Sequence, residues 1–131
     1  METNHKRVLF IEDDFYIAEI FQFALEESGF TVILANDGEK GLEALASDNY
    51  DIVLLDIMLP KINGIEILRK CFAPDFPKKN LNIILLSNLA QENIIKEGLK
   101  LGAKEFILKD QMLPKELAAK VAETLAVSAP E

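Results

Sequence analysis

The segment Asp51–Pro60 (DIVLLDIMLP) constrains the fold more than any other part of the chain. Apolar residues 52–55 lie between two acids, and a proline follows shortly after the second acid. An apolar run of this length, bounded by polar and turn residues, is typical of a strand buried on both faces. Asp56 then lies where the strand leaves the core, which is where open α/β sheets carry their functional groups.

Similar apolar runs recur along the chain and alternate with segments of helical periodicity. We predict strands at 8–11, 30–35, 52–55, 81–86 and 105–108, each followed by a helix. In the first helix the apolar positions are Ile17, Ile20, Phe21, Ala24 and Leu25. Strictly alternating strands and helices require parallel strands joined by right-handed crossovers, so the expected fold is a three-layer α/β sandwich.

The length of 131 residues suits one domain, and we assign residues 1–127 to it and 128–131 to a tail or the start of a linker. The single cysteine, Cys71, excludes an intrachain disulfide and is predicted to be a buried thiol on a helix face. The net charge of −8 argues against non-specific binding to nucleic acid. Without an apolar segment of signal or membrane-spanning length, we expect a cytoplasmic protein that contacts no membrane.

Polar residues directly follow four of the five predicted strands. They are Glu12-Asp13-Asp14, Asp56, Ser87-Asn88 and Lys109. Each has a simple structural explanation: Asp14 is a candidate N-cap of the first helix, Ser87 or Asn88 of the fourth, and Lys109 could lie in solvent. Parallel strands all end at one edge of the sheet, however. Four strands therefore deliver carboxylates, a hydroxyl and an ammonium to one place.

This set of groups favours phosphoryl chemistry. Clustered carboxylates cannot all stay ionised unless a cation joins them, and oxygen ligands with room for water suit Mg²⁺. A carboxylate such as Asp56 can then act as nucleophile and form an acyl phosphate. The charge on the transferred group would be neutralised by Mg²⁺, the Ser87 hydroxyl and the Lys109 ammonium, one for each equatorial oxygen.

In order and spacing these motifs resemble the receiver domain of two-component response regulators, the family of the bacterial chemotaxis response regulator. The likeness runs from Lys6 to about Leu125. Four motifs carry it: Ile11-Glu12-Asp13, Leu55–Pro60 with Gly64, Leu86-Ser87, and Leu108-Lys109. The resemblance implies a flavodoxin-like (βα)5 fold with strand order 2-1-3-4-5.

The resemblance also implies roles for the acidic residues. Asp56 is the expected phosphoacceptor, which takes its phosphoryl group from a sensor histidine kinase or a phosphotransfer protein. Asp13 and Asp56 would bind Mg²⁺ directly and Glu12 through water, while the backbone carbonyl of Met58 would be the third protein ligand.

The remaining motif residues would form the switch. Ser87 matches the switch hydroxyl, Lys109 the phosphate-binding lysine and Phe106 the switch aromatic residue. Phosphorylation would draw Ser87 to the phosphoryl group, and Phe106 would rotate inward. The face made by the fourth helix, the fifth strand and the fifth helix would then signal to a partner or output domain, and the same face is a possible homodimer interface.

Two features depart from the family pattern or tune it. Asp110 follows Lys109 where the family usually has proline after a cis bond, so we predict a trans bond and a rearranged loop that could redirect Lys109. Met58 and Leu89, two residues past the acceptor and two past the switch hydroxyl, are apolar and cannot orient a water by hydrogen bonding. We therefore hypothesise a long-lived phosphorylated state.

Two other functions fit parts of the pattern. An aspartyl-nucleophile phosphatase also uses an aspartate at a strand end with Mg²⁺, but Met58 occupies the position where that class needs a second acid. A phosphorylation-independent interaction module on the same fold is the other alternative, and the complete set of acceptor, acids, hydroxyl and lysine argues against it. The chain is thus expected to accept phosphoryl groups and not to be a dedicated enzyme.

Overall fold

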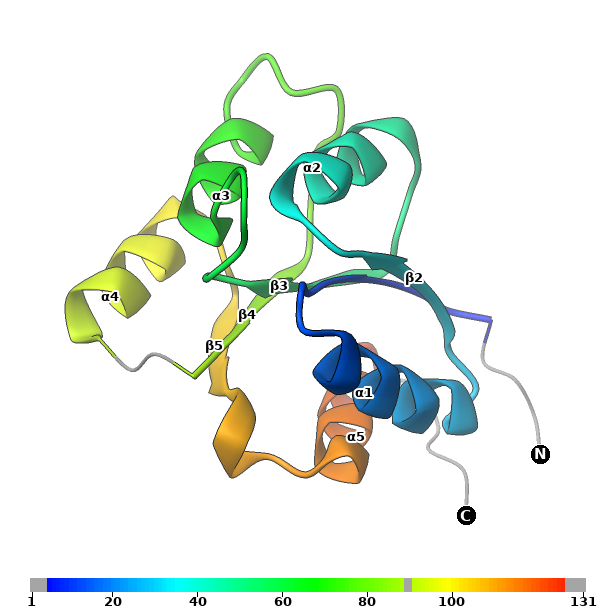
Figure 1. The fold of residues 1–131 in the computed structure, drawn as a ribbon. Coiled ribbons are helices and arrows are strands. Elements are labelled where there is room, and N and C mark those ends of the chain that lie inside the picture. Colours follow the sequence, from blue (N-terminus) through cyan, green and yellow to red (C-terminus); the bar gives the residue numbers. More distant parts are fainter. Residues whose placement is uncertain (1–4, 89–90, 127–131) are drawn as a thin grey trace.

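The computed structural model describes residues 5–88 and 91–126, which form a five-stranded parallel sheet between two layers of helices (Figure 1). The strand order is β2-β1-β3-β4-β5, and every neighbouring pair is parallel. The strands are β1 (Arg7–Ile11), β2 (Thr31–Ala35), β3 (Ile52–Asp56), β4 (Ile83–Ser87) and β5 (Glu105–Leu108). The helices are α1 (Phe15–Glu27), α2 (Gly38–Ser47), α3 (Gly64–Cys71), α4 (Glu92–Leu101) and α5 (Pro114–Thr124). The predicted flavodoxin-like sandwich is therefore confirmed.

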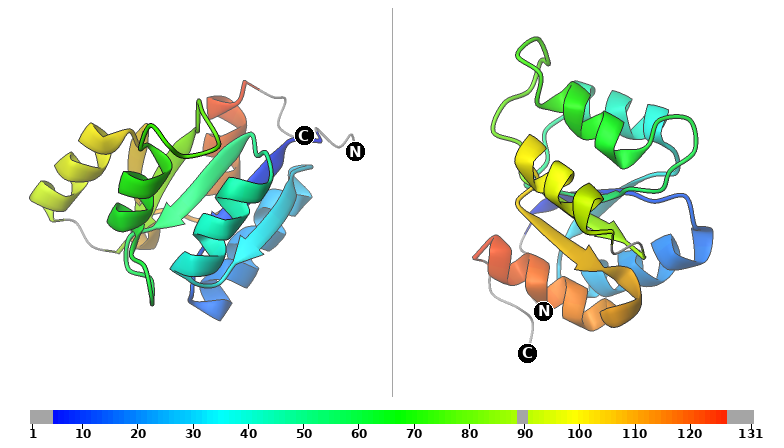
Figure 2. Two further views of the ribbon diagram at one scale, coloured as in Figure 1. Left: turned by 90° about the horizontal axis from the view of Figure 1, so that it is seen from above. Right: turned by 90° about the vertical axis from the view of Figure 1, so that its left-hand side faces the viewer.

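The helices divide between the two faces of the sheet: α1 and α5 cover one, and α2, α3 and α4 cover the other (Figures 1 and 2). Successive residues of a strand point to opposite faces, so β1 supplies both cores. Val8 and Phe10 pack with α1 and α5, while Leu9 and Ile11 pack on the α2 and α3 side. Every residue of the central strand β3 is buried, which fixes the position of its last residue, Asp56.

Local capping signals placed most helix ends. Asp14 caps α1 by accepting hydrogen bonds from the backbone of Tyr16 and Ile17, as one structural explanation of this acid required. Asp37 caps α2 in the same way, and Pro114 begins α5. Gly102 ends α4 with a φ of 137°, a backbone conformation that favours glycine.

Some predictions about the elements were wrong. Neither Ser87 nor Asn88 caps the fourth helix, because Ser87 is the last residue of β4 and Gln91 is the N-cap. Ile20 does not belong to the buried face of α1, since it is 53% exposed. The buried stripe runs instead through Ala18, Phe21, Ala24 and Leu25, and Ile20 lies beside it on the solvent side.

Two further predictions concern Cys71 and the membrane. Cys71 is buried at the end of α3, as predicted, and burial raises the pKa of its thiol to about 12. Such a thiol is protonated at neutral pH and unreactive. Among the helices of the described residues, none combines the length and apolar character needed to cross a membrane. The tail at 128–131 and Leu89 lie outside the described residues.

Candidate functional site

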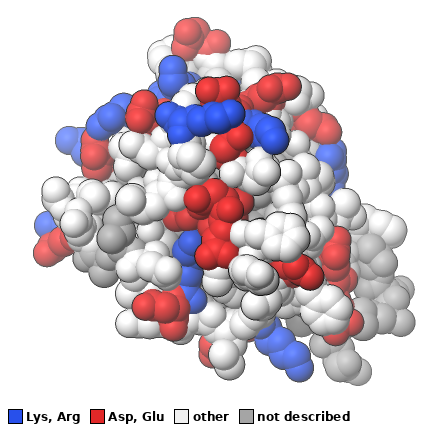
Figure 3. All heavy atoms as spheres, viewed as in Figure 1, with Lys and Arg blue, Asp and Glu red and all other residues white. Residues whose placement is uncertain are grey.

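The polar residues that follow the strands do come together at the carboxyl edge of the sheet. Asp56 ends β3, Ser87 ends β4, and Glu12 and Lys109 directly follow β1 and β5. All four are buried, whereas the neighbouring Asp13 is exposed. Carboxylate oxygens of Glu12, Asp13 and Asp56 lie within 4.8 Å of one another. In Figure 3 acidic side chains gather at the centre of this face.

The Lys109 ammonium joins two of these acids. Its Nζ lies 2.7 Å from Glu12 Oε1 and 3.1 Å from Asp56 Oδ2. All three side chains are almost fully buried, so solvent screens this cluster little. Burial lowers the pKa of Lys109, but the hydrogen bond to Glu12 and the charge of Asp56 outweigh it, so the pKa is above its usual value. Lys109 is therefore a fixed cation at neutral pH.

Glu12 is the acid of the cluster whose ionisation is least favourable. Burial raises the pKa of its carboxyl to about 7, although its hydrogen bonds to Lys109 and to the Asp14 backbone N–H act in the opposite direction. The cluster has three carboxylates, whereas Lys109 and one proton together neutralise only two of them. A second cation would let all the acids ionise, so a metal ion bound here would compete with the proton on Glu12.

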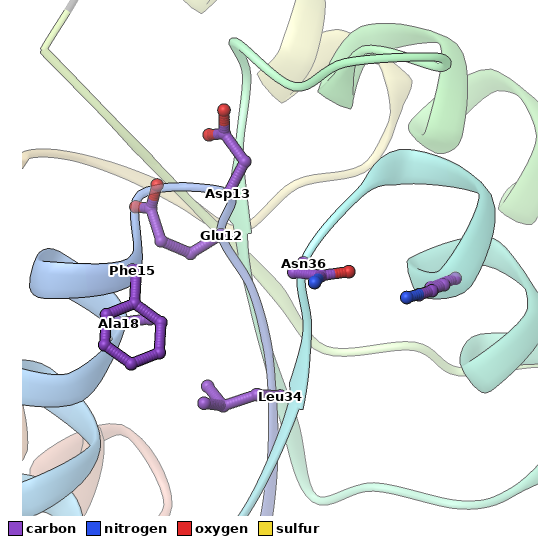
Figure 4. A pocket seen from close by; sticks show the side chains of 7 residues that line it. Glu12, Asp13, Phe15, Ala18, Leu34 and Asn36 are labelled. Carbon is purple, nitrogen blue, oxygen red and sulfur yellow. The ribbon is translucent and has the colours of Figure 1, made fainter.

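The donor set fits Mg²⁺. Three carboxylates at the ends of the neighbouring strands β1 and β3 offer only oxygen ligands, and the exposed Asp13 leaves one side open to water. Beside the acids lies a pocket of about 340 Å³ between α1 and the end of β2 (Figure 4). It is lined by Glu12, Asp13, Phe15, Ala18, Leu34, Asn36 and Lys40. Glu12 and Asp13 thus border this hollow, whereas Asp56 is not among its lining residues.

The chain folds back over Asp56 directly after the strand. The Met58 N–H donates a hydrogen bond to Asp56 Oδ1 at 3.2 Å, and Gly64 N–H donates to the Ile57 carbonyl at 2.9 Å. A Cβ at Gly64 would lie 2.5 Å from the Asp56 carbonyl oxygen, so the start of α3 approaches the strand more closely than a side chain allows. This turn brings the Met58 backbone beside the Asp56 carboxylate, while the Met58 side chain is 59% exposed.

The predicted trans peptide bond after Lys109 is confirmed. The described residues contain no cis peptide bond, and Lys109–Gln111 form one turn of 3₁₀ helix before α5. This turn does not carry the Lys109 ammonium away from the acids, because Lys109 contacts both Glu12 and Asp56. Phe106 is half-buried and packs against the core on the α2–α3 side.

Two features of the site were missed from the sequence. The first is the ion pair between Lys109 and Glu12, since the sequence suggested only phosphate or solvent as surroundings of Lys109. The solvent alternative was wrong, because Lys109 is buried. The second is Asn63, whose side chain caps α3 by accepting from the Glu66 backbone at 3.0 Å. An asparagine directly before Gly64 is a recognisable N-cap signal. The Lys109–Glu12 pair has no comparable local signal.

A family model described as "Response regulator receiver domain" matches residues 8–122. The transcriptional regulatory protein PhoP for alkaline phosphatase synthesis of Bacillus subtilis is 34% identical over 117 residues, which is 89% of this chain and 47% of that protein. The DNA-binding response regulator MtrA of Mycobacterium tuberculosis is 35% identical over 121 residues, or 92% of this chain and 51% of that protein. The chain thus spans about half the length of these relatives.

Solved structures show the same fold. A CheY-like response regulator receiver domain protein from Methanospirillum hungatei superposes with a TM-score of 0.84 at 28% identity, covering 94% of this chain and 95% of that one. The receiver domain of a Francisella response regulator gives a TM-score of 0.82 at 30% identity, with 93% and 98% of the two chains covered.

Proposed function

Because this chain belongs to the response regulator receiver domain family, we propose that it accepts a phosphoryl group on Asp56 and signals through its α4–β5–α5 face. One observation carries the proposal. Asp56 is buried at the end of a rigid strand, with a lysine ammonium 3.1 Å away and two further carboxylates within 4.8 Å. A lone structural aspartate would need neither the lysine nor the acids.

The transfer is a displacement at phosphorus. An Asp56 carboxylate oxygen attacks the phosphorus of a phosphohistidine on a sensor histidine kinase or a phosphotransfer protein. The new O–P bond forms as the N–P bond breaks, and the bonding pair leaves with the imidazole nitrogen. Asp13, Asp56 and the Met58 carbonyl would hold Mg²⁺, with Glu12 acting through water, and the ion would supply charge neutralisation on the phosphoryl oxygens.

The chain's own cation completes the charge balance. Lys109 pairs with Asp56 Oδ2 before transfer, so its ammonium is already within reach of a phosphoryl oxygen attached to that carboxylate. As Lys109 turns to the phosphoryl group, its hydrogen bond with Glu12 weakens. The hydroxyl of Ser87, at the end of β4, donates a hydrogen bond to another phosphoryl oxygen. The half-buried Phe106 then moves into the space beside β4.

The partner that receives the signal is assigned only by its class. The two relatives carry names that describe transcriptional regulation or DNA binding, but this chain matches only about half of each. We therefore assign this domain a downstream protein or output domain as its partner, without direct contact to nucleic acid. A homodimer through the α4–β5–α5 face would be one way to pass the signal on.

The phosphorylated state is proposed to be long-lived. The Met58 side chain is exposed next to the acceptor and has no group that could orient an attacking water. The lifetime can be followed by loss of the phosphoryl group after removal of the donor. A lifetime of seconds would overturn this part of the proposal.

The acceptor assignment is tested with acetyl phosphate as donor and phosphate-affinity electrophoresis as readout. We expect wild type to be modified only when Mg²⁺ is present, and Asp56→Asn to remain unmodified. Asp51→Asn, at the other end of β3, is the matched control and should react like wild type. Modification of Asp56→Asn would contradict the assignment. An interaction module that works without phosphorylation would leave wild type unmodified.

A further inference from the structure

The loop between β3 and α3, residues 57–63, contains a strained turn. Lys61 has a φ of 70°, and the Ile62 N–H donates a hydrogen bond to the Pro60 carbonyl at 2.9 Å. A backbone hydrogen bond between residues i and i+2, with a positive φ at the residue between them, defines the rare form of the γ-turn. This conformation is unfavourable for a residue other than glycine. Such a turn persists only where its surroundings hold it in place.

The N-terminus of α2 supplies two contacts that hold the turn. The Gly38 N–H donates a second hydrogen bond to the Pro60 carbonyl at 3.3 Å. Asp37 Oδ2 lies 3.6 Å from the Lys61 ammonium, while Asp37 Oδ1 accepts from the Lys40 backbone and caps the helix. Asp37 is only 7% exposed, although an N-cap carboxylate needs no such burial. The same aspartate therefore caps the start of α2 and pairs with the loop.

The third contact explains the glycine. A Cβ on Gly38 would lie 1.8 Å from the Ile62 carbonyl oxygen, which is a backbone atom and cannot yield as a flexible side chain can. Gly41, one turn further along α2, is also buried, but a Cβ there would meet only the side-chain carbons of Ile11, at 2.8 Å. Of these two glycines in α2, only Gly38 is required by the loop.

We propose that Asp37 and Gly38 are positioning residues for the acceptor site: they hold the strained turn at Lys61 and so keep the Met58 backbone beside Asp56. Gly64 fixes the far end of the loop against β3, and the α2 N-terminus fixes its middle. Gly64 holds the Ile57 carbonyl and Gly38 holds the Pro60 carbonyl. Met58 lies between these two residues and donates a hydrogen bond to Asp56 Oδ1.

The consequence for metal binding rests on the proposed function, in which the Met58 carbonyl is a Mg²⁺ ligand. Mg²⁺ demands near-ideal octahedral geometry, so a displaced backbone carbonyl is a poor ligand. Residues that orient a ligand from outside typically change metal affinity by about 10-fold or more. Asp37 and Gly38 are not themselves ligands and touch none of the three carboxylates that gather at the site.

The first test compares Gly38→Ala with Gly41→Ala. We expect Gly38→Ala to bind Mg²⁺ roughly tenfold more weakly by calorimetry, and the ¹⁵N–¹H resonance of Met58 to shift even without metal. Gly41→Ala is expected to keep the wild-type Met58 resonance and Mg²⁺ affinity, even if it loses stability. Equal Mg²⁺ affinity and an unmoved Met58 resonance in Gly38→Ala would overturn the proposal.

A second pair of variants does not put the fold at risk, because the Lys61 side chain is 53% exposed. Lys61→Gly and Lys61→Val both remove the ammonium, but only glycine adopts positive φ readily. We expect Lys61→Gly to keep the Met58 resonance and Lys61→Val to shift it and to weaken Mg²⁺ binding as Gly38→Ala does. The proposal fails if the two variants behave alike. If wild type neither binds Mg²⁺ nor accepts phosphate, the proposed function fails, while the Met58 resonance still reports on the loop.

Discussion

Acid–base pairs lie at both ends of the central strands, but the pair at one end is exposed and the pair at the other is buried. At the amino end the Arg7 guanidinium lies 3.0 Å from Asp48, and the side chains are 38% and 49% exposed. At the carboxyl end Lys109 lies 2.7 Å from Glu12, and the side chains are 7% and 0% exposed. The distances are similar, so burial separates the two pairs.

This difference shows what each pair contributes. Exposed pairs gain little, because water screens them and two long side chains must be ordered. At the amino end Arg7 also packs 5.1 Å from the centre of the Tyr50 ring, and its backbone N–H donates to Asp51, so its charge is one contact among several. Buried charges are costly to desolvate, and apolar residues would often serve stability as well or better. The buried cluster at the carboxyl end is therefore better explained by chemistry at Asp56 than by stability.

The largest effect is expected from Lys109→Met. This change leaves Glu12 and Asp56 buried without their cation, and breaking a buried pair in this way costs about 3–5 kcal/mol. Urea denaturation at pH 8 measures the loss in the free energy of unfolding. We expect part of the loss to be recovered at pH 5, where Glu12 can take up a proton. Unchanged stability at pH 8 would show that the cluster does not depend on Lys109.

The second effect is a pH dependence that Glu12 imposes on the metal-free protein. The folded-state pKa of Glu12 is about 7, compared with an ordinary value of 4.5. Between these values the folded protein holds a proton that the unfolded chain has released, so the free energy of unfolding falls as pH rises through this window. The fall is on the order of 3 kcal/mol and is complete above pH 7.

Glu12→Gln is the control for this titration, because the amide keeps the size and an acceptor but cannot ionise. We expect the difference between wild type and Glu12→Gln to change across pH 4.5–7 and to stay constant outside that range. Saturating Mg²⁺ should flatten the wild-type profile, because the metal favours the ionised carboxylates. If the free energies of unfolding of the two proteins change in parallel with pH, Glu12 is not the group that causes the pH dependence.

The third effect separates metal binding from folding. Asp13 is exposed, so Asp13→Asn is expected to unfold at nearly the same temperature as wild type when Mg²⁺ is absent. Mg²⁺ should raise the melting temperature of wild type, since a ligand that binds only the folded state stabilises it. Asp13→Asn should lose most of this increment. An equal increment in both proteins would show that Asp13 is not a ligand.

The elements of the fold were predictable because their signals are local. Asp14, Asp37 and Gly102 each act on backbone groups within a few residues, and the apolar runs identify the strands within one or two residues. Ile20 shows the limit of this reasoning. Helical periodicity places it near the buried stripe, but only the packing of α1 against α5 and the sheet decides which edge of the stripe is covered.

The contacts that complete the site join residues far apart in the chain. Lys109 and Glu12 are separated by 97 positions, and no local pattern indicates that one ammonium serves two acids. The packing of Gly38 on the loop after Asp56 is likewise invisible in the sequence, where the glycine looks like part of a helix start. The strand order followed from the family resemblance, because alternation of strands and helices permits several orders.

The smallest effect is expected at the amino end, where Arg7→Met removes an exposed cation as Lys109→Met removes a buried one. Methionine loses the exposed pair with Asp48 and the guanidinium contact with the Tyr50 ring. Exposed contacts of either kind contribute little to stability, so thermal unfolding of Arg7→Met should differ little from that of wild type. Its response to acetyl phosphate and Mg²⁺ should also be unchanged. Both changes remove one cation and introduce the same side chain, and the pair at the amino end is exposed whereas the one at the carboxyl end is buried, so we expect different outcomes. A loss of stability as large as that of Lys109→Met would mean that the surroundings of Arg7 matter as much as those of Lys109, and burial could no longer explain why we place the proposed chemistry at the carboxyl end.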